Sequence, residues 1–107
     1  MDITEPNKDG FTIYSKSGCI NCTKIKKLLK EENIFFLEIS CDEFLIENKE
    51  SFLLFISEKV KKEYKTFPMI FFNGDFIGGY NEAKEFYEII VREKNKLIAF
   101  DDNSVFN

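Results

Sequence analysis

Histidine is absent from this 107-residue chain, and cysteine and proline occur only three times and twice. The missing histidines matter for metal binding, because a structural zinc site usually needs four thiolate or imidazole ligands. The chain offers two clustered cysteines, Cys19 and Cys22, and a distant Cys41. We therefore expect no metal site built by one chain alone.

The chain also lacks an excess of positive charge and any long apolar run. Its 15 basic and 19 acidic residues give a net charge of −4, which does not favour nucleic acid as a partner. No apolar stretch approaches the length of a membrane span, and the first ten residues resemble no secretory signal. We expect a cytoplasmic protein without a membrane partner, located in the host cytoplasm if the source is viral. Free thiols stay reduced there, so a Cys-x-x-Cys pair favours metal or redox chemistry over a structural disulfide.

The composition itself indicates one folded domain. Apolar residues make up 44% of the chain and include 13 phenylalanines, which is enough for a single packed core. We see no internal repeat, low-complexity segment or linker. We expect one domain over residues 1–107, with residues 1–10 as an N-terminal extension and residues 101–107 as a frayed tail.

The apolar patterns predict strands and helices in alternation. Pro68 is expected to end the second helical region, and Asn73-Gly74 is a strong hairpin signal. Leu97–Phe100 fits no predicted element. The predicted strands are Phe11–Ser15, Ile34–Ser40, Met69–Phe72 and Phe76-Ile77, and the predicted helices are Ile20–Glu32, about Phe44 to Tyr64, and a last one from about Asn81. This order predicts an α/β layered domain whose first two strands are parallel.

The stretch KSGCINCTK, residues 16–24, places Cys19 just before the first predicted helix. Backbone N–H groups and the helix dipole favour a thiolate there, and the pKa of such a leading cysteine falls from about 8.5 into a range of roughly 3.5 to 7.5. Lys16 and Lys24 act in the same direction. Cys22 shares the apolar face of the helix, where it can resolve a mixed disulfide formed at Cys19.

Other interpretations of the three cysteines remain open from the residues alone. A structural disulfide over so short a loop would gain little from loop entropy, and the pair Cys19 and Cys22 can also be two unrelated buried thiols. Cys41 ends a predicted strand, which indicates an ordinary buried or half-exposed thiol, with a regulatory role as the alternative.

Two later motifs also have two interpretations each. Thr66-Phe67-Pro68 is either a helix stop or a cis-proline motif whose backbone pairs with an extended ligand. The segment from Gly78 to Glu82 is either a plain turn with an asparagine cap or a glycine turn that brings backbone N–H groups close to a carboxylate.

Taken together, YSKSGCINC and TFPMIFFNGDFIGGY resemble the glutaredoxins, small thioredoxin-fold oxidoreductases that use glutathione. The resemblance covers roughly residues 11 to 92. It implies a four-stranded mixed sheet in the order 2-1-3-4 flanked by three or more helices, with the last two strands antiparallel to the first two.

The resemblance also implies roles for individual residues. Cys19 matches the nucleophilic cysteine and Cys22 the resolving one. Lys16 matches the lysine that meets the glycine carboxylate of glutathione, and Glu82 stands in the turn for the γ-glutamyl end, where aspartate is commoner. The implied glutathione-binding residues are Lys16, Lys65, Thr66, Phe67, Pro68, Gly79, Tyr80, Asn81 and Glu82, with Phe67 pairing through its backbone and Pro68 as the cis-proline.

The implied activity is a glutathione-dependent thiol–disulfide oxidoreductase acting as a monomer. Glutathione would be the reductant, and proteins with disulfides or glutathione adducts would be the substrates, ribonucleotide reductase among them. Ile20 and Asn21 stand where the usual dithiol signature has proline and tyrosine. In the family, the lack of this proline permits a non-enzymatic alternative, in which a dimer bridges an iron–sulfur cluster through Cys19 and glutathione. A redoxin that accepts electrons from thioredoxin reductase is the third hypothesis.

Overall fold

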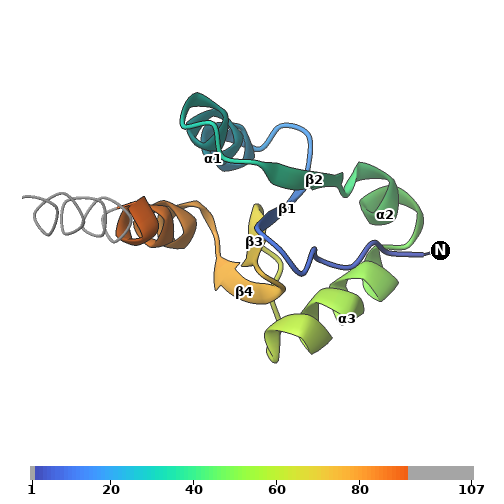
Figure 1. Cartoon of the computed structure of the whole chain (residues 1–107). Coiled ribbons are helices and arrows are strands. Elements are labelled where there is room, and N and C mark those ends of the chain that lie inside the picture. The colour runs from blue at the N-terminus through green and yellow to red at the C-terminus, as the bar shows by residue number, and fades with distance from the viewer. Residues whose placement is uncertain (1, 92–107) are drawn as a thin grey trace, which may run out of the picture.

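A four-stranded sheet forms the centre of the protein, whose computed structural model describes residues 2–91. The strands are β1 (Phe11–Ser15), β2 (Phe36–Ser40), β3 (Met69–Phe72) and β4 (Asp75–Gly78), in the order β2-β1-β3-β4 (Figure 1). The predicted order 2-1-3-4 is confirmed. The expectations for residues 97–100 and 101–107 lie outside the described residues.

The strand directions confirm the prediction for β3 and correct it for β4. β1 is parallel to β2 and antiparallel to β3, and β4 is antiparallel to β3, so β4 has the same direction as β1. The reason is the predicted hairpin: Asn73 and Gly74 both have positive φ, 52° and 87°, as the tight two-residue turn between antiparallel strands requires.

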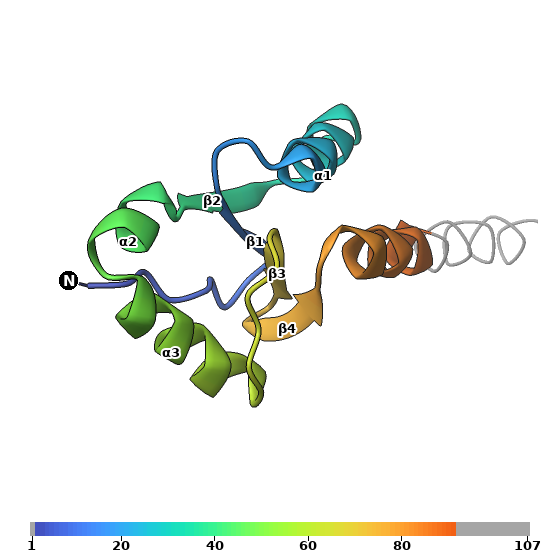
Figure 2. The same ribbon diagram turned by 180° about the vertical axis from the view of Figure 1, so that it is seen from behind.

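Helices cover both faces of the sheet (Figures 1 and 2). Helix α1 (Ile20–Glu31) and a helix over residues 80–91 lie on one face, and α2 (Asp42–Glu47) and α3 (Lys49–Val60) lie on the other. Side chains alternate along β1, so that Ile13 packs in the core beneath α1 and Tyr14 packs with Phe52 of α3. This gives the layered α/β fold that the sequence predicts.

The single helix predicted from Phe44 to Tyr64 is wrong, because the chain forms two helices there. Asn48, at φ −153° and ψ 51°, has left the helical region, and asparagine is a weak former of helix interiors. The break lets the ring of Phe44 stack on that of Phe52, at a centroid distance of 5.5 Å. The second helix then ends at Val60, because Lys61 takes a left-handed conformation with φ 69°; Pro68 is not the stop.

The second strand starts at Phe36 and not at Ile34. Asn33 has a φ of 58°, and the N–H of Ile34 donates to the carbonyl of Leu29 at 2.8 Å. Ile34 therefore belongs to the turn that closes α1, and the chain becomes extended only after it.

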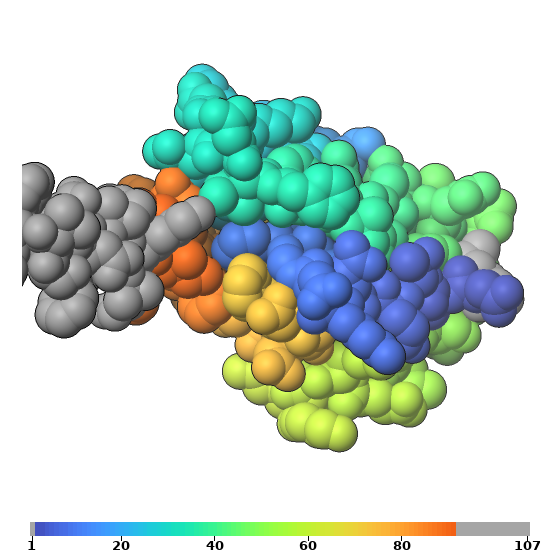
Figure 3. Space-filling view, in the orientation of Figure 1, coloured from blue at the N-terminus to red at the C-terminus, as the bar shows by residue number. Residues whose placement is uncertain are grey.

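The segment before β1 has no regular structure, yet it is attached to the domain. The hydroxyl of Tyr14 donates to the carbonyl of Thr4 at 2.6 Å, and Lys59 of α3 pairs with Glu5. Figure 3 shows this segment (blue) lying against α3 (yellow-green). These residues form a strap along the α3 side of the sheet.

Candidate active site

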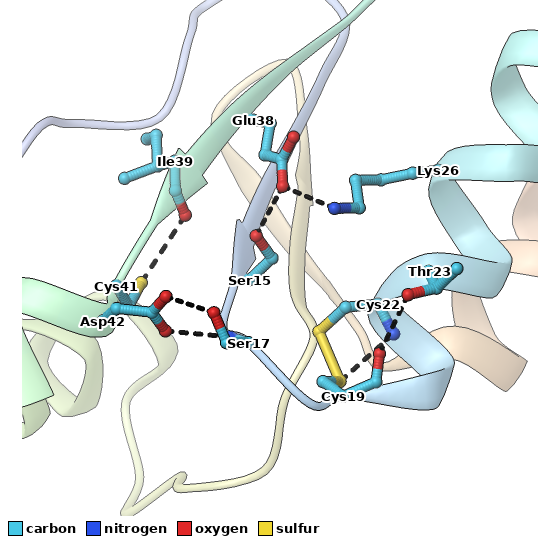
Figure 4. The surroundings of a disulfide bond; sticks show 10 residues. All are labelled: Ser15, Ser17, Cys19, Cys22, Thr23, Lys26, Glu38, Ile39, Cys41 and Asp42. Atoms are coloured by element: carbon cyan, nitrogen blue, oxygen red, sulfur yellow. Dashed lines mark hydrogen bonds and ion pairs between the residues drawn. A yellow bond between two sulfur atoms is a disulfide. The ribbon is translucent and has the colours of Figure 1, made fainter.

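Cys19 is the N-cap of α1 and is joined to Cys22 by a disulfide, with the two Cα atoms 5.2 Å apart (Figure 4). The Sγ atom of Cys19 accepts a hydrogen bond from the backbone N–H of Cys22 at 3.1 Å. The sulfur therefore occupies the position of a capping oxygen, against the unpaired N–H groups of the helix. The predicted placement of Cys19 just before the helix is confirmed.

The two sulfurs differ in exposure. Cys22 is 1% exposed and belongs to the core cluster that contains Phe67, whereas Cys19 is only partly buried. Ile20 is 73% exposed, so the residues between the cysteines face solvent. A substrate sulfur approaching from solvent would meet Cys19 first.

The surroundings of Cys19 favour negative charge on its sulfur once the disulfide is reduced. The first turn of α1 contains no acidic residue, and the loop before it carries Lys16. The helix N-terminus and the charge of Lys16 stabilise a thiolate relative to a thiol, and no acidic side chain in the first turn opposes them.

An ion pair joins α1 to β2, and a hydrogen bond links the same carboxylate to β1. Nζ of Lys26 lies 2.6 Å from Oε2 of Glu38 on β2, and the hydroxyl of Ser15 donates to the same oxygen at 2.8 Å. The hydrogen bond from Lys26 holds the pKa of Glu38 below its usual range. The helix capped by Cys19 is thereby joined to β2 directly, and to β1 through Glu38.

The loop between β1 and Cys19, Lys16–Gly18 (the cysteine loop), is held by a residue that the sequence did not single out. Asp42, the first residue of α2, accepts hydrogen bonds from the backbone N–H of Ser17 at 2.8 Å and from its hydroxyl at 2.5 Å. These bonds, together with the charge of Lys16, lower the pKa of Asp42. No sequence signal points to this pair, because Asp42 lies far along the chain in an ordinary helix.

Three of the predicted binding residues lie together beside the cysteine loop. They line a pocket of about 190 Å³ that is formed by Lys16, Leu45, Lys49, Leu53, Lys65 and Phe67. Nζ of Lys16 lies 5.3 Å from the ring centroid of Phe67. Lys49 was missed by the sequence analysis, because the unexpected break at Asn48 is what places it at the start of α3.

The predicted glycine turn lies beside Pro68, the residue that follows Phe67. The Phe67–Pro68 peptide bond is cis, as the cis-proline interpretation predicts. A Cβ atom at Gly79 would lie 3.7 Å from the carbonyl oxygen of Pro68 and 3.6 Å from the hydroxyl oxygen of Tyr64. Tyr64 therefore borders this turn, which the sequence analysis did not predict.

Glu82 caps its own helix. Its Oε1 accepts a hydrogen bond from the N–H of Gly79 at 2.8 Å, which is the carboxylate half of a capping box. Gly78 has a φ of 136°, and a Cβ there would lie 2.8 Å from Cβ of Glu82, so the close approach requires glycine. The asparagine-cap alternative is wrong, since Asn81 lies within the helix.

The remaining predicted residues are more peripheral. Thr66 and Asn81 are exposed, and Tyr80 is half-buried, with Nζ of Lys24 lying 5.7 Å from its ring centroid. The predicted residues thus form a group around Lys16 and Phe67 and a second group around Gly79, joined by the cis-proline segment.

Cys41 is a buried thiol. Burial raises the pKa of Cys41 to about 12, and the neighbouring charge of Asp42 acts in the same direction. The expectation of an ordinary buried thiol agrees with this position.

Within residues 2–91, no group of three or more histidine, cysteine, aspartate or glutamate side chains is placed to hold a metal ion. No helix in that part of the chain is both long and apolar enough to span a membrane.

Comparison with known proteins gives one consistent result. The family model described as Glutaredoxin matches residues 11–77. The chain is 37% identical over 67 residues to Glutaredoxin 1 of Rickettsia felis, a match that covers 63% of this chain and 61% of that protein. The matched segment thus spans less than two thirds of the length of that relative.

A solved structure and a shorter relative extend this result. The crystal structure of Glutaredoxin 1 from Francisella tularensis has a TM-score of 0.65 at 31% identity, covering 77% of this chain and 95% of that one. This likeness confirms the expected thioredoxin-like fold. The glutaredoxin-like protein NrdH of Lactococcus lactis is 50% identical over 32 residues, which is 30% of this chain and 44% of that protein.

Proposed function

The chain belongs to the glutaredoxin family, and we propose that it is a glutathione-dependent thiol–disulfide oxidoreductase. The observation that carries the proposal is the asymmetry of the cysteine pair. Cys19 is accessible and caps α1 through its sulfur, whereas Cys22 is buried one turn later. This arrangement separates a nucleophile from a resolving thiol.

The first step is attack by the Cys19 thiolate on a glutathione mixed disulfide. A bond forms between Sγ of Cys19 and the glutathione sulfur, the substrate disulfide breaks, and the substrate sulfur leaves as a thiolate that takes a proton from water. The protein substrate is thereby reduced, and the oxidising equivalent now lies on Cys19.

The second step releases glutathione by one of two routes. A second glutathione thiolate attacks the adduct and forms oxidised glutathione, which regenerates the Cys19 thiolate. Alternatively, Cys22 attacks Sγ of Cys19, glutathione leaves as a thiolate, and the disulfide between Cys19 and Cys22 forms, the bond present in this structure. Two glutathione molecules then reduce that disulfide.

The charges of the two residue groups suit the two ends of glutathione. Lys16, Lys49 and Lys65 around the pocket would attract the glycine carboxylate. The backbone of Phe67, ahead of the cis-proline, would pair with the cysteinyl part. At the turn, backbone N–H groups would meet the γ-glutamyl carboxylate, and the carboxylate oxygen of Glu82 that does not bind Gly79 would meet its ammonium.

Substrates and setting follow from the same proposal. We propose disulfide-containing or glutathionylated proteins as substrates, ribonucleotide reductase among them, and a monomer acting in the cytoplasm. The exposed Ile20 beside Cys19 offers such a protein an apolar contact next to the reacting sulfur.

A redoxin that takes electrons from thioredoxin reductase is the second candidate. The 50% identity to NrdH over 32 residues is the observation that favours it. An iron–sulfur cluster carrier would need Cys19 from two chains together with glutathione thiolates, because no set of metal ligands is gathered within residues 2–91.

Steady-state kinetics with each reductant separates these candidates. We expect turnover of a glutathione mixed disulfide with glutathione and glutathione reductase, and little turnover with thioredoxin reductase. The Cys22→Ser variant should keep much of the glutathione-driven rate, since a second glutathione can resolve the adduct. Turnover with thioredoxin reductase alone would contradict the proposal, as would a brown protein that is catalytically inert and whose visible absorbance persists only with glutathione.

A further inference from the structure

We propose that Asp42 is a positioning residue that holds the cysteine loop, and with it Lys16 and Cys19, in the geometry needed for reaction. The role of Cys19 in this inference needs only a reactive thiol, whereas the role of Lys16 rests on the glutathione-dependent function proposed above.

The contact itself is two-pronged. Oδ1 of Asp42 accepts from the backbone N–H of Ser17 at 2.8 Å, and Oδ2 accepts from the Ser17 hydroxyl at 2.5 Å (Figure 4). Both carboxylate oxygens thus bind one residue of the loop, and hydrogen bonds to an ionised acceptor are the stronger kind. Such a pair fixes both the position and the rotation of Ser17.

The cysteine loop has little packing to hold it. Lys16, Ser17 and Gly18 are all exposed. Gly18 has a φ of 72°, and a Cβ there would have no neighbouring heavy atom within 4 Å. The loop therefore depends on polar contacts for its shape, and the contact with Asp42 lies at its middle residue.

Asp42, the acceptor in this contact, is itself held in place at the end of β2. The N–H of Cys41 donates to the carbonyl of Ser15 at 2.8 Å, which continues the pairing of β1 and β2 up to the residue before Asp42. The carboxylate is consequently fixed relative to the end of β1, where the loop begins. Asp42 thus ties the middle of the cysteine loop to the adjoining ends of β1 and β2.

Two features of the site depend on how the loop is held. Lys16 precedes Ser17 and lies over the Phe67 ring at the pocket. Cys19 follows two residues after Ser17 and must keep its extended backbone, φ −103° and ψ 107°, for its sulfur to cap α1. A loop that is ordered before the substrate arrives avoids the entropy cost of ordering it on binding.

The charge of Asp42 has a separate effect that a test must distinguish. A negative charge near Lys16 and Cys19 disfavours the thiolate, so that its removal alone would lower the pKa of Cys19. Asp42→Asn keeps an oxygen for the Ser17 N–H and offers an amide N–H to the Ser17 hydroxyl. Asp42→Ala removes both the contact and the charge.

The test uses the full chain with Asp42→Ala, Asp42→Asn and Ser17→Ala, and with Glu43→Ala as the matched control. Glu43 is the next residue of α2, carries the same charge and is exposed. Alkylation of Cys19 by iodoacetamide is followed against pH in a Cys22→Ser, Cys41→Ala background, so that one thiol reports. In parallel, KM and kcat for a glutathione mixed disulfide are measured with Cys22 and Cys41 intact.

We expect Asp42→Ala to raise the alkylation midpoint and to raise KM by about 10-fold through the mobile Lys16. Asp42→Asn should keep KM close to that of the unaltered chain, and Ser17→Ala should give a KM between those of Asp42→Asn and Asp42→Ala. Glu43→Ala should match the unaltered chain. Should Asp42→Ala fail to fold, Asp42→Asn and Ser17→Ala still carry the test.

An alkylation midpoint that falls equally in Asp42→Ala and Asp42→Asn would overturn the inference, because charge would then explain the effect. Unchanged values in Asp42→Ala would also overturn it. If the chain does not use glutathione at all, the kinetic arm gives no turnover for any variant, whereas the alkylation arm still decides whether Asp42 positions Cys19.

Discussion

Cys19 and Cys41 occupy equivalent places in the fold. Cys19 follows β1 and is the N-cap of α1, and Cys41 follows β2 and is the N-cap of α2. Because β1 and β2 are parallel neighbours, both thiols lie at the same end of the sheet. A helix start alone would predict two activated cysteines.

Their surroundings are opposite. The sulfur of Cys19 accepts a hydrogen bond from the helix, whereas the thiol of Cys41 donates to the carbonyl of Ile39 at 3.6 Å, away from α2. Helix α1 has 12 residues and no acid in its first turn, whereas α2 has six residues and begins with Asp42 and Glu43. Cys41 is also fully buried.

The difference shows what a reactive cysteine needs beyond a helix N-terminus. The sulfur must point at the unpaired N–H groups, remain reachable by solvent, and have no acidic residue in the first turn of its own helix. Cys19 meets all three conditions and Cys41 meets none. Burial, and after it the charge of Asp42, raises the pKa of Cys41 to about 12.

The largest effect is expected from removing the reactive thiol. Cys19→Ser should lower the reduction of a glutathione mixed disulfide by at least about 100-fold, because a serine hydroxyl is not ionised near neutral pH. Cys41→Ala is the matched control and should stay near the rate of the unaltered chain. A coupled glutathione reductase assay measures both, and equal activity in Cys19→Ser would remove Cys19 from the mechanism.

The second effect concerns stability at alkaline pH. Burial raises the pKa of Cys41 from 9.0 to about 12, so between these values the folded chain keeps a proton that the unfolded chain has lost. Stability from this proton is complete below pH 9.0 and falls above it by at most about 1.4 kcal/mol per pH unit.

Urea unfolding at pH 8 and at pH 10 measures this effect in the unaltered chain and in Cys41→Ala. The loss of unfolding free energy between the two pH values should be smaller in the variant. Burial also raises the pKa of Tyr14. Because Tyr14 is present in both proteins, its contribution to the loss of unfolding free energy cancels in the comparison. An equal loss in both proteins would mean that Cys41 titrates as an exposed thiol.

The smallest effect comes from giving α1 the acidic first turn that α2 has. Asn21 is exposed and lies in that turn, and Asn21→Asp should raise the pKa of Cys19 by up to about 0.7 unit. Alkylation of Cys19 below its midpoint would slow by up to about 5-fold. Asn21→Gln is the neutral control, and an unchanged rate in Asn21→Asp would show that first-turn charge does not reach the sulfur.

Local patterns predicted the elements whose structure depends on local sequence. The bounds of β1 and β3 agree with the prediction, because each is a short apolar run limited by turn residues. The hairpin at Asn73-Gly74 and the position of Cys19 before α1 depend on neighbouring residues in the same way.

The unpredicted features arise from contacts between distant parts of the chain. The break at Asn48 lets Phe44 stack on Phe52, and it places Lys49 at the pocket. The bond between Asp42 and Ser17 needs β1 and β2 to pair first. Contacts of this kind cannot be predicted from the spacing of residue types along the sequence.

The most direct test of the account is alkylation of the reduced, folded chain from pH 5 to pH 9, with modified cysteines identified by mass spectrometry. We predict that Cys19 reacts with a midpoint below about 7.5, while Cys41 stays unmodified throughout. Modification of Cys41 together with Cys19, or a Cys19 midpoint at the ordinary value of about 8.5, would contradict the claim that their surroundings separate the two thiols.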